Sequence, residues 1–82
     1  MISIIKITNS LGLHARASSK LVKLTKKFSS QMNISKGNLV IDAKSILGIL
    51  SLGASFGTEI EIETVGDDEE IAMMEIIDLF QN

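Results

Sequence analysis

Between residues 59 and 63, glutamate and isoleucine alternate strictly in the order Glu-Ile-Glu-Ile-Glu. Successive side chains of a β-strand point to opposite faces of a sheet, so this alternation predicts a strand with one buried and one exposed face. A strand of this kind belongs to a sheet that is covered on one side only. The rest of the chain is therefore expected to supply the covering layer.

Three further segments have the composition of short strands. Residues 2–7 are mainly isoleucine and partly alternate, and residues 31–35 and 39–41 are two more short candidates. The last two are joined at Lys36, Gly37 and Asn38. Glycine followed by asparagine suits a two-residue hairpin turn, because both residues tolerate a positive φ.

The remaining segments predict helices. Residues 15–28 carry apolar side chains at helical spacing, at Ala17, Leu21, Leu24 and Phe28. A short helix is expected from Ile46, with Ser45 as its N-cap. This helix is apolar on nearly every side, so it is either fully buried or exposes an apolar patch formed by Ile46, Leu47 and Leu50.

The last helix is expected to open at Gly66 or Asp67, where four consecutive acids complement the positive end of the helix dipole. Asp67 and Glu70 have the spacing of a capping box. Acids at a helix start indicate capping rather than metal binding. The residues expected to face the core are Ile71, Met74, Ile77 and Phe80.

These elements follow one another in the order β-α-β-β-α-β-α. The predicted fold is an α+β two-layer open-faced sandwich, with three helices on one face of a four-stranded antiparallel sheet. Eighty-two residues leave room for one hydrophobic core, so residues 1–82 are expected to form a single domain.

The composition argues against several classes of protein. No apolar run is long enough to span a membrane, and the N-terminus lacks the basic-then-apolar order of a secretory signal. We therefore expect a cytoplasmic protein without membrane insertion. The absence of cysteine rules out disulfides and thiolate metal sites, and a zinc site with a single histidine would be unusual. We expect no metal and no cofactor.

Charge is distributed very unevenly. Residues 1–45 carry eight basic side chains and one acid, Asp42, whereas residues 46–82 carry nine acids and no base. A row of basic residues recurs at helical spacing: Arg16, Lys20, Lys23 and Lys27. This row is either an ordinary solvated helix face or a docking surface for an acidic protein. A net charge of −2 and only three aromatic residues argue against a nucleic-acid partner.

The segment Gly12-Leu13-His14-Ala15-Arg16 contains the single histidine of the chain. Histidine is the side chain whose ordinary pKa lies closest to neutrality. Because a helix is predicted to begin near Ala15, the imidazole lies beside unpaired N–H groups and the positive end of the helix dipole. Such a helix start is a ready anion site, most often for phosphate. The alternative is that His14 is merely the residue at the helix entrance.

Two motifs, GLHAR and the later DAKSILGILSLGASFGTEIEI, resemble those of the HPr family, the histidine-containing phosphocarrier proteins of the bacterial phosphotransferase system. The similarity runs over essentially the whole chain, with both motifs in the family's order and spacing. The resemblance implies the sheet order 1-4-2-3. It also implies a carrier that takes phosphate from enzyme I, which is charged by phosphoenolpyruvate, and passes it to an enzyme IIA protein or domain.

The resemblance assigns the phosphohistidine to His14 and a regulatory phosphorylation site to Ser45, for which an HPr kinase/phosphorylase is a further candidate partner. Alternatively, Ser45 is only an N-cap. The Arg16 side chain and the N–H groups of Ala15, Arg16 and Ala17 would offset the charge of the phosphoryl group. The expected docking residues for partners are Lys20, Lys23, Lys27, Ile46, Leu47 and Leu50.

One position departs from the family pattern, because residue 17 is alanine where the family usually has proline. Proline in the first turn of a helix fixes φ and gives up an N–H that lacks an intrahelical acceptor. Alanine restores this N–H and favours the helix. The difference is therefore expected in how rigidly His14 and Arg16 are held.

A carrier of this kind accepts and donates phosphate and has no small-molecule turnover of its own. We expect a monomer that serves either sugar uptake or nitrogen-type regulation. The alternative is a regulatory interaction protein that is controlled by Ser45 phosphorylation and performs no histidine phosphotransfer. The presence of both His14 and Arg16 argues against that alternative.

Overall fold

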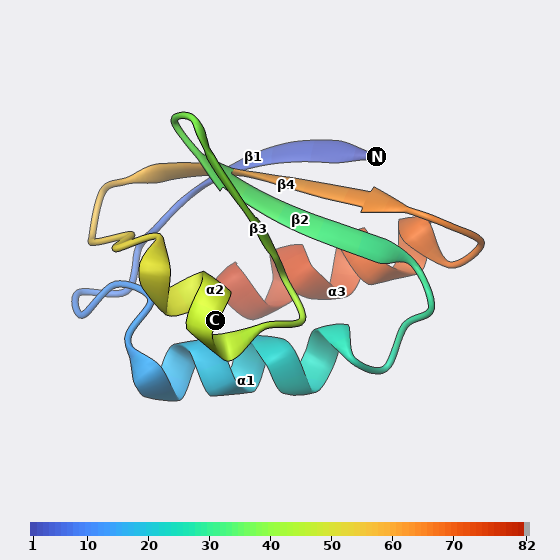
Figure 1. Ribbon diagram of the computed structural model, residues 1–82, viewed down its shortest axis with the longest axis horizontal. Helices are drawn as coiled ribbons and strands as arrows, with labels where there is room; N and C mark the ends of the chain where they lie inside the picture. Colours follow the sequence, from blue (N-terminus) through green and yellow to red (C-terminus); the bar gives the residue numbers. More distant parts are fainter. Residues whose placement is uncertain (82) are drawn as a thin grey trace.

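The computed structural model describes residues 1–81, which form four strands and three helices. In chain order these are β1 (Ile2–Lys6), α1 (Ala15–Thr25), β2 (Gln31–Lys36), β3 (Leu39–Asp42), α2 (Ile46–Ser51), β4 (Glu59–Val65) and α3 (Glu69–Gln81). The strands are antiparallel in the order β1-β4-β2-β3, and the helices lie on one face of the sheet (Figure 1). The predicted element order, layers and sheet order are confirmed.

β4 lies in the middle of the sheet and carries the alternating pattern that predicted it. Ile60 and Ile62 are buried beneath the helices, whereas Glu59 and Glu61 are exposed on the opposite face. β1 pairs with one edge of β4 and β2 with the other. Side chains alternate between the two faces of the sheet, and the helices cover only one of them, so the second face stays open to solvent.

β2 and β3 form the predicted hairpin, and each runs one residue further than its pattern indicated. Lys36 pairs with Leu39 across a two-residue turn. Of the two turn residues, Gly37 has a positive φ, 60°, and Asn38 does not. Hairpin turns that place glycine first have this property, so the turn depends on Gly37.

The face that α1 buries overlaps the predicted stripe in part, because Leu21 is in the core and Leu24 and Phe28 pack against it. The buried residues of this helix are Ser18, Leu21, Val22 and Thr25. Of the predicted stripe, only Leu21 is buried, and the half-buried members are Ala17, Leu24 and Phe28. The Ser18 hydroxyl donates to the Leu13 carbonyl at 3.2 Å, and the Thr25 hydroxyl donates to the Ala43 carbonyl at 2.9 Å. Hydrogen-bonded hydroxyls can be buried, which apolar periodicity does not detect.

α3 begins at Glu69, later than the predicted Gly66 or Asp67, and its buried face overlaps the predicted one only in part. Ile71 and Met74, two of the expected core residues, are 53% and 69% exposed, so both predictions are wrong. The residues that contact the core are Ala72, Met73, Ile76 and Leu79, together with the predicted Ile77 and Phe80. Apolar residues occur on nearly every side of this helix, so spacing alone does not select the buried face.

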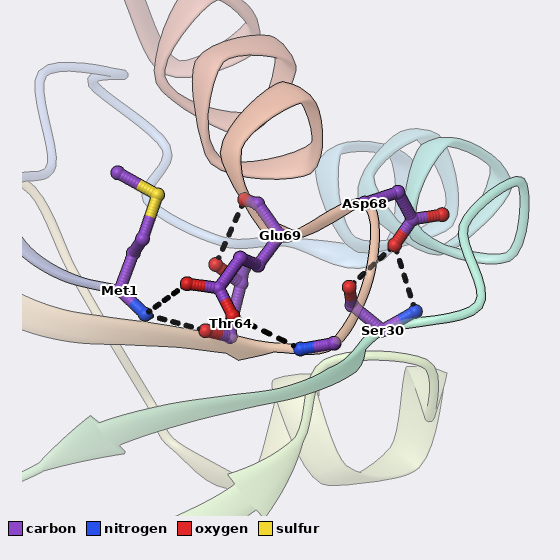
Figure 2. A network of polar contacts seen from close by, with 6 residues as sticks. Met1, Ser30, Thr64, Asp68 and Glu69 are labelled. Atoms are coloured by element: carbon purple, nitrogen blue, oxygen red, sulfur yellow. Dashed lines mark hydrogen bonds and ion pairs between the residues drawn. The ribbon is translucent and has the colours of Figure 1, made fainter.

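The predicted capping box of Asp67 and Glu70 is wrong, because the reciprocal pair lies one residue earlier. The Gly66 N–H donates to Glu69 Oε1 at 3.1 Å, and the Glu69 N–H donates to the Gly66 carbonyl at 3.2 Å. The other carboxylate oxygen of Glu69 lies 3.5 Å from the α-amino group of Met1 (Figure 2). The hydrogen bond from the Gly66 N–H lowers the pKa of Glu69, and the positive charge of the α-amino group lowers it further by a smaller amount.

Asp68 joins the start of α3 to the loop between α1 and β2. Its carboxylate accepts the backbone N–H groups of Ser29 and Ser30, both at 2.9 Å, and also the hydroxyls of both serines. Figure 2 shows the contact with Ser30. These hydrogen bonds lower the pKa of Asp68 from 3.8 to about 2, and the bond from the Ser30 hydroxyl has the largest effect. The carboxylates of Asp68 and Glu69 therefore bind the protein's own backbone.

Candidate functional site

The loop between β1 and α1 is held against the loop that follows α2. Gly12 has a φ of 66°, and a Cβ at this position would lie 2.5 Å from the Ala54 carbonyl oxygen, so a larger residue would not fit. Leu13 donates its N–H to the same oxygen at 2.9 Å. These contacts fix the position at which α1 begins.

His14 is the N-cap of α1, so the predicted helix start at Ala15 is confirmed. Its backbone is extended, and its carbonyl accepts the first helical bond from the Ser18 N–H at 2.8 Å. The imidazole is half-buried, and its Nδ1 accepts the backbone N–H of Arg16 at 3.2 Å. A ring nitrogen that accepts a hydrogen bond carries no proton, so the Nδ1 lone pair points toward the start of the helix.

The first turn of α1 offers positive charge and contains no acid. The N–H groups of Ala15 and Ala17 precede Ser18, whose N–H is the first to meet an acceptor within the helix. The Arg16 side chain is exposed and forms no ion pair with the described part of the chain. The structure thus brings an imidazole, a guanidinium and backbone donors to one exposed helix end, which is chemically suited to a small dianion.

A groove of about 450 Å³ lies beside this helix start. Its lining includes Leu13, Ala17 and Lys20 on one side and Leu79 and Phe80 of α3 on the other. His14 is not among the lining residues. The imidazole therefore lies at the surface next to the groove and not inside it.

The basic row, defined as Arg16, Lys20, Lys23 and Lys27, is exposed along its whole length. Lys27 follows the end of α1, so the row continues onto the turn that leads to β2. None of the four side chains forms an ion pair with a residue in the described span. The row is an open cationic surface that begins beside His14.

α2 divides its apolar residues between core and solvent. Ile49 is fully buried, whereas Ile46, Leu47 and Leu50 are exposed, Leu47 by 81%. These three exposed residues form the α2 patch. Ser45 is the N-cap as predicted, because its Oγ accepts the Gly48 N–H at 3.0 Å. Of the two outcomes expected for this helix, the structure shows the exposed patch.

The structure does not bring Ser45 and His14 together. The start of α1 contacts the loop after α2, whereas Thr25 at the end of α1 bonds Ala43 just before α2. The two helices therefore run in opposite directions. Ala43, which bonds the far end of α1, precedes Ser45 by two residues, and the six residues of α2, about 9 Å of helix, separate Ser45 from the loop beside His14.

Two exposed apolar residues near the site escaped the sequence analysis. Leu11 and Phe56 lie on the two loops that contact each other beside His14, and both are largely exposed. Each directly precedes a glycine in a short loop, where a large apolar side chain is unusual, and this was the available signal. The apolar surface near the site thus extends beyond α2.

Metal ligands do not gather anywhere in residues 1–81. No three histidine, cysteine, aspartate or glutamate side chains of this span are placed to hold an ion. In the same span, no helix combines the length and the hydrophobicity needed to cross a membrane.

Comparison with known proteins finds relatives over nearly the whole chain. The family model described as the PTS HPr component phosphorylation site matches residues 3–82. The phosphocarrier protein HPr of Xylella fastidiosa is 46% identical over 76 residues, which cover 93% of this chain and 85% of that protein.

Two solved structures come from Thermoanaerobacter tengcongensis. The one described as HPr-C-His has a TM-score of 0.96 and 43% identity, and the match covers 99% of this chain and 91% of that one. The one described as an HPr dimer has a TM-score of 0.80 and 45% identity, over 94% and 88% of the two chains. Sequence, fold and site motif agree, and the chain belongs to the HPr family of phosphocarrier proteins of the phosphotransferase system.

Proposed function

We propose that this chain accepts a phosphoryl group on His14 from enzyme I, which is charged by phosphoenolpyruvate, and passes it to an enzyme IIA protein or domain. The observation that carries the proposal is the hydrogen bond from the Arg16 N–H to Nδ1 of His14. This bond directs an unprotonated nitrogen toward the donors at the start of α1. Nδ1 is therefore the nitrogen that we expect to be phosphorylated.

In the transfer, the Nδ1 lone pair attacks phosphorus while the bond between phosphorus and the donor group breaks, and the donor keeps that electron pair. Nδ1 then no longer accepts the Arg16 N–H, which becomes available to a phosphoryl oxygen together with the Ala17 N–H. These donors and the Arg16 guanidinium offset the arriving charge. When a group of enzyme IIA attacks phosphorus, the N–P bond breaks and Nδ1 recovers its lone pair.

Surface placement of the imidazole suits a carrier, because two different proteins must reach the same phosphorus atom. His14 lies outside the neighbouring groove, so no small substrate needs to be enclosed. We assign the carrier to the cytoplasm, where either sugar uptake or nitrogen-type regulation would use it. The identity of its enzyme IIA partner distinguishes these two branches.

Phosphorylation by enzyme I and phosphoenolpyruvate tests the proposal. We expect one acid-labile, alkali-stable phosphate, located on Nδ1 by ¹⁵N labelling of the imidazole. His14→Ala should accept none, and His14→Asn, which keeps an N-cap side chain, controls for folding. Phosphate uptake by His14→Ala would refute the proposal, and phosphate on Nε2 would refute the assignment to Nδ1.

Arg16 should affect transfer more than folding, because its side chain is exposed beside the phosphoryl group. Hydrogen bonds to charged groups contribute about 1.5–3 kcal/mol, so Arg16→Ala should slow phosphotransfer by about tenfold to a hundredfold. Arg16→Lys should restore part of the rate. A large loss of thermal stability with normal transfer would contradict this role.

The basic row and the α2 patch are proposed as one docking surface for acidic partners. Lys20→Glu, Lys23→Glu and Leu47→Asp should each weaken binding of enzyme I or enzyme IIA, and salt should screen the lysine effects with a Debye length of about 8 Å at physiological ionic strength. Lys6→Glu makes the same change of charge on the open face of the sheet and serves as the control. Chemical-shift mapping of a partner onto the sheet face would contradict the assignment.

A second candidate function is regulation through phosphorylation of Ser45 by an HPr kinase/phosphorylase. The supporting observation is that Ser45 caps α2 directly beside the exposed Ile46 and Leu47. A dianion is tolerated at a helix start but would have to be desolvated against the α2 patch during docking. Ser45→Asp should therefore remain folded and accept phosphate from enzyme I more slowly.

Unchanged phosphotransfer kinetics in protein fully phosphorylated at Ser45 would leave this residue with its capping role alone. If Ser45 phosphorylation controlled a binding partner while His14 accepted no phosphate, the regulatory interaction protein would be the correct function.

A further inference from the structure

The face of the sheet that the helices leave uncovered combines acids with exposed isoleucines. β4, at its centre, presents Glu59, Glu61 and Glu63 to this face. On the neighbouring edge strand β1, Ile2 and Ile4 are 60% and 68% exposed. The register places Ile2 opposite Glu63 and Ile4 opposite Glu61. These five residues are named the open-face patch.

None of the glutamates of the open-face patch forms an ion pair within the described chain. One cation, Lys6, lies opposite Glu59 on this face, so the three glutamates still leave an excess of negative charge. Toward β2, Glu61 lies opposite Ser35 and Glu63 opposite Asn33, both uncharged. Same-face residues of one strand are about 7 Å apart, so the glutamates form an evenly spaced row. A shallow groove of about 330 Å³ lies beside this row and has Ile4 and Glu61 in its lining.

The opposite side of the molecule has the complementary chemistry. There the basic row presents exposed cations at helical spacing, next to the exposed apolar side chains of the α2 patch. Figure 1 shows α1 on the side of the molecule away from the sheet, so the basic row and the open-face patch face in opposite directions. One copy cannot bring its own two surfaces together, but two copies can.

We propose that the open-face patch of one copy docks on the basic row and α2 patch of a second copy. Glutamates meet lysines, and the isoleucines of β1 meet the apolar side chains of α2. Such a front-to-back contact leaves one of each surface free, so the assembly is an open chain and not a closed pair. Each exposed ion pair is weak, and we expect a Kd on the order of 1 mM.

Self-docking covers the surface that begins at Arg16 and competes there with enzyme I and enzyme IIA. At high protein concentration it would therefore limit phosphorylation of His14. This consequence rests on the proposed function, whereas the docking itself does not.

Two double variants test the contact by reversing either side of it. Lys20→Glu/Lys23→Glu lowers the net charge of the basic row from +4 to zero and places two acids at its centre, and Glu61→Lys/Glu63→Lys makes the sheet side basic. The rotational correlation time from ¹⁵N relaxation is measured against protein concentration at low salt, where the Debye length is about 30 Å, and at 1 M salt, where it is about 3 Å.

For the unmodified protein we expect the correlation time to rise with concentration at low salt and to stay flat at 1 M salt, with amide shifts on β1, β4, α1 and α2. Each double variant alone should show no rise, because the attraction between its two surfaces is lost: the helix variant sets two acids against the acidic sheet face, and in the sheet variant both surfaces are basic. An equimolar mixture of the two should recover the rise. Glu61→Gln/Glu63→Gln removes the charge without reversing it, and it replaces the lysine variant if that variant does not fold.

Glu70→Lys/Glu75→Lys on α3 makes the same change of charge at exposed positions away from both surfaces. It should associate as the unmodified protein does, and if it behaves like the sheet variant, net charge and not the open-face patch is responsible. A flat concentration series, association that survives 1 M salt, or shifts confined to β1 or α3 would each overturn the proposal.

The functional consequence is tested separately. Dilute Glu61→Lys/Glu63→Lys should be phosphorylated by enzyme I at the normal rate, and at millimolar concentration it should be phosphorylated faster than the unmodified protein. If His14 accepts no phosphate at all, the proposed function fails while the relaxation results stand. If the relaxation series is flat while His14 is phosphorylated, only the self-docking fails.

Discussion

The starts of α1 and α3 are opposite in chemistry although both are positive ends of helix dipoles. At α3, two glutamates lie in the first turn, and the carboxylates of Asp68 and Glu69 accept backbone N–H groups of neighbouring segments. At α1 the first turn has no acid, and the cap is an imidazole that accepts a single N–H. A helix start that already holds carboxylates repels a further anion. The capacity to bind phosphate therefore depends on which charges and donors are left unmatched.

The largest effect should come from giving α1 the chemistry of α3. Ala17→Glu places a carboxylate at the third helical position, from which it can reach back to the His14 N–H, as Glu69 reaches Gly66. The added charge opposes the incoming phosphoryl group, so phosphorylation by enzyme I should slow by about a hundredfold while the melting temperature holds or rises. Ala17→Gln is the uncharged control, and an equal loss there would show that charge is not the cause.

The largest effect on stability should come from removing the carboxylate of Asp68. Its pKa is about 2 in the folded protein and 3.8 ordinarily, so its stabilisation is complete above about pH 4 and is lost as the pH falls through 2. Urea denaturation between pH 2 and 5 should therefore show a steeper loss of stability for the unmodified protein than for Asp68→Ala. Asp67→Ala, an exposed neighbour, is the control. Parallel pH curves for the unmodified protein and Asp68→Ala would contradict the assignment.

A smaller effect is expected at the start of α2, which is capped by a neutral hydroxyl. Ser45→Ala removes one hydrogen bond to the Gly48 N–H and should lower the free energy of unfolding by about 1 kcal/mol. The loss should be smaller than that of Asp68→Ala, which removes the acceptor of four hydrogen bonds. Ser45→Thr keeps a capping hydroxyl and should recover most of the stability, and if it does not, the cap is not the source of the effect.

The smallest effect should follow Ala17→Pro, which removes a single N–H from the first turn of α1. Proline is tolerated there, so the helix should persist. One neutral hydrogen bond contributes about 0.5–1.5 kcal/mol, and phosphorylation should slow by about twofold to tenfold. Ala17→Gly keeps the N–H and loosens the helix, so it separates the donor from rigidity. An equal rate change in the glycine variant would show that rigidity matters and the donor does not.

The sheet and the start of α1 could be predicted because short-range patterns determine them. The alternation around Ile60 and Ile62 identified β4, and the apolar periodicity of residues 15–28 placed the start of α1 beside His14. The buried faces of α1 and α3 could be predicted only in part. Thr25 is buried because of a carbonyl at Ala43, which is distant in the sequence.

Asp68 likewise bonds Ser29 and Ser30, almost forty residues earlier in the chain. Within the candidate site, the neighbourhood of His14 and Arg16 and the cap at Ser45 were predictable, since each is local. The separation of Ser45 from His14 could not be predicted, because it depends on the opposite directions of α1 and α2.

The pairing of β1 with β4 has a consequence for biosynthesis. Ile2 lies opposite Glu63, and β2 also needs β4 as its neighbour, so the strand at the centre of the sheet leaves the ribosome after both strands that flank it. Until then β1 has no pairing partner, and the isoleucines of β1 and β2 are not yet covered by β4. A nascent chain arrested before residue 59 should therefore be readily cleaved by protease, and resistance should be acquired in one late step after release of β4.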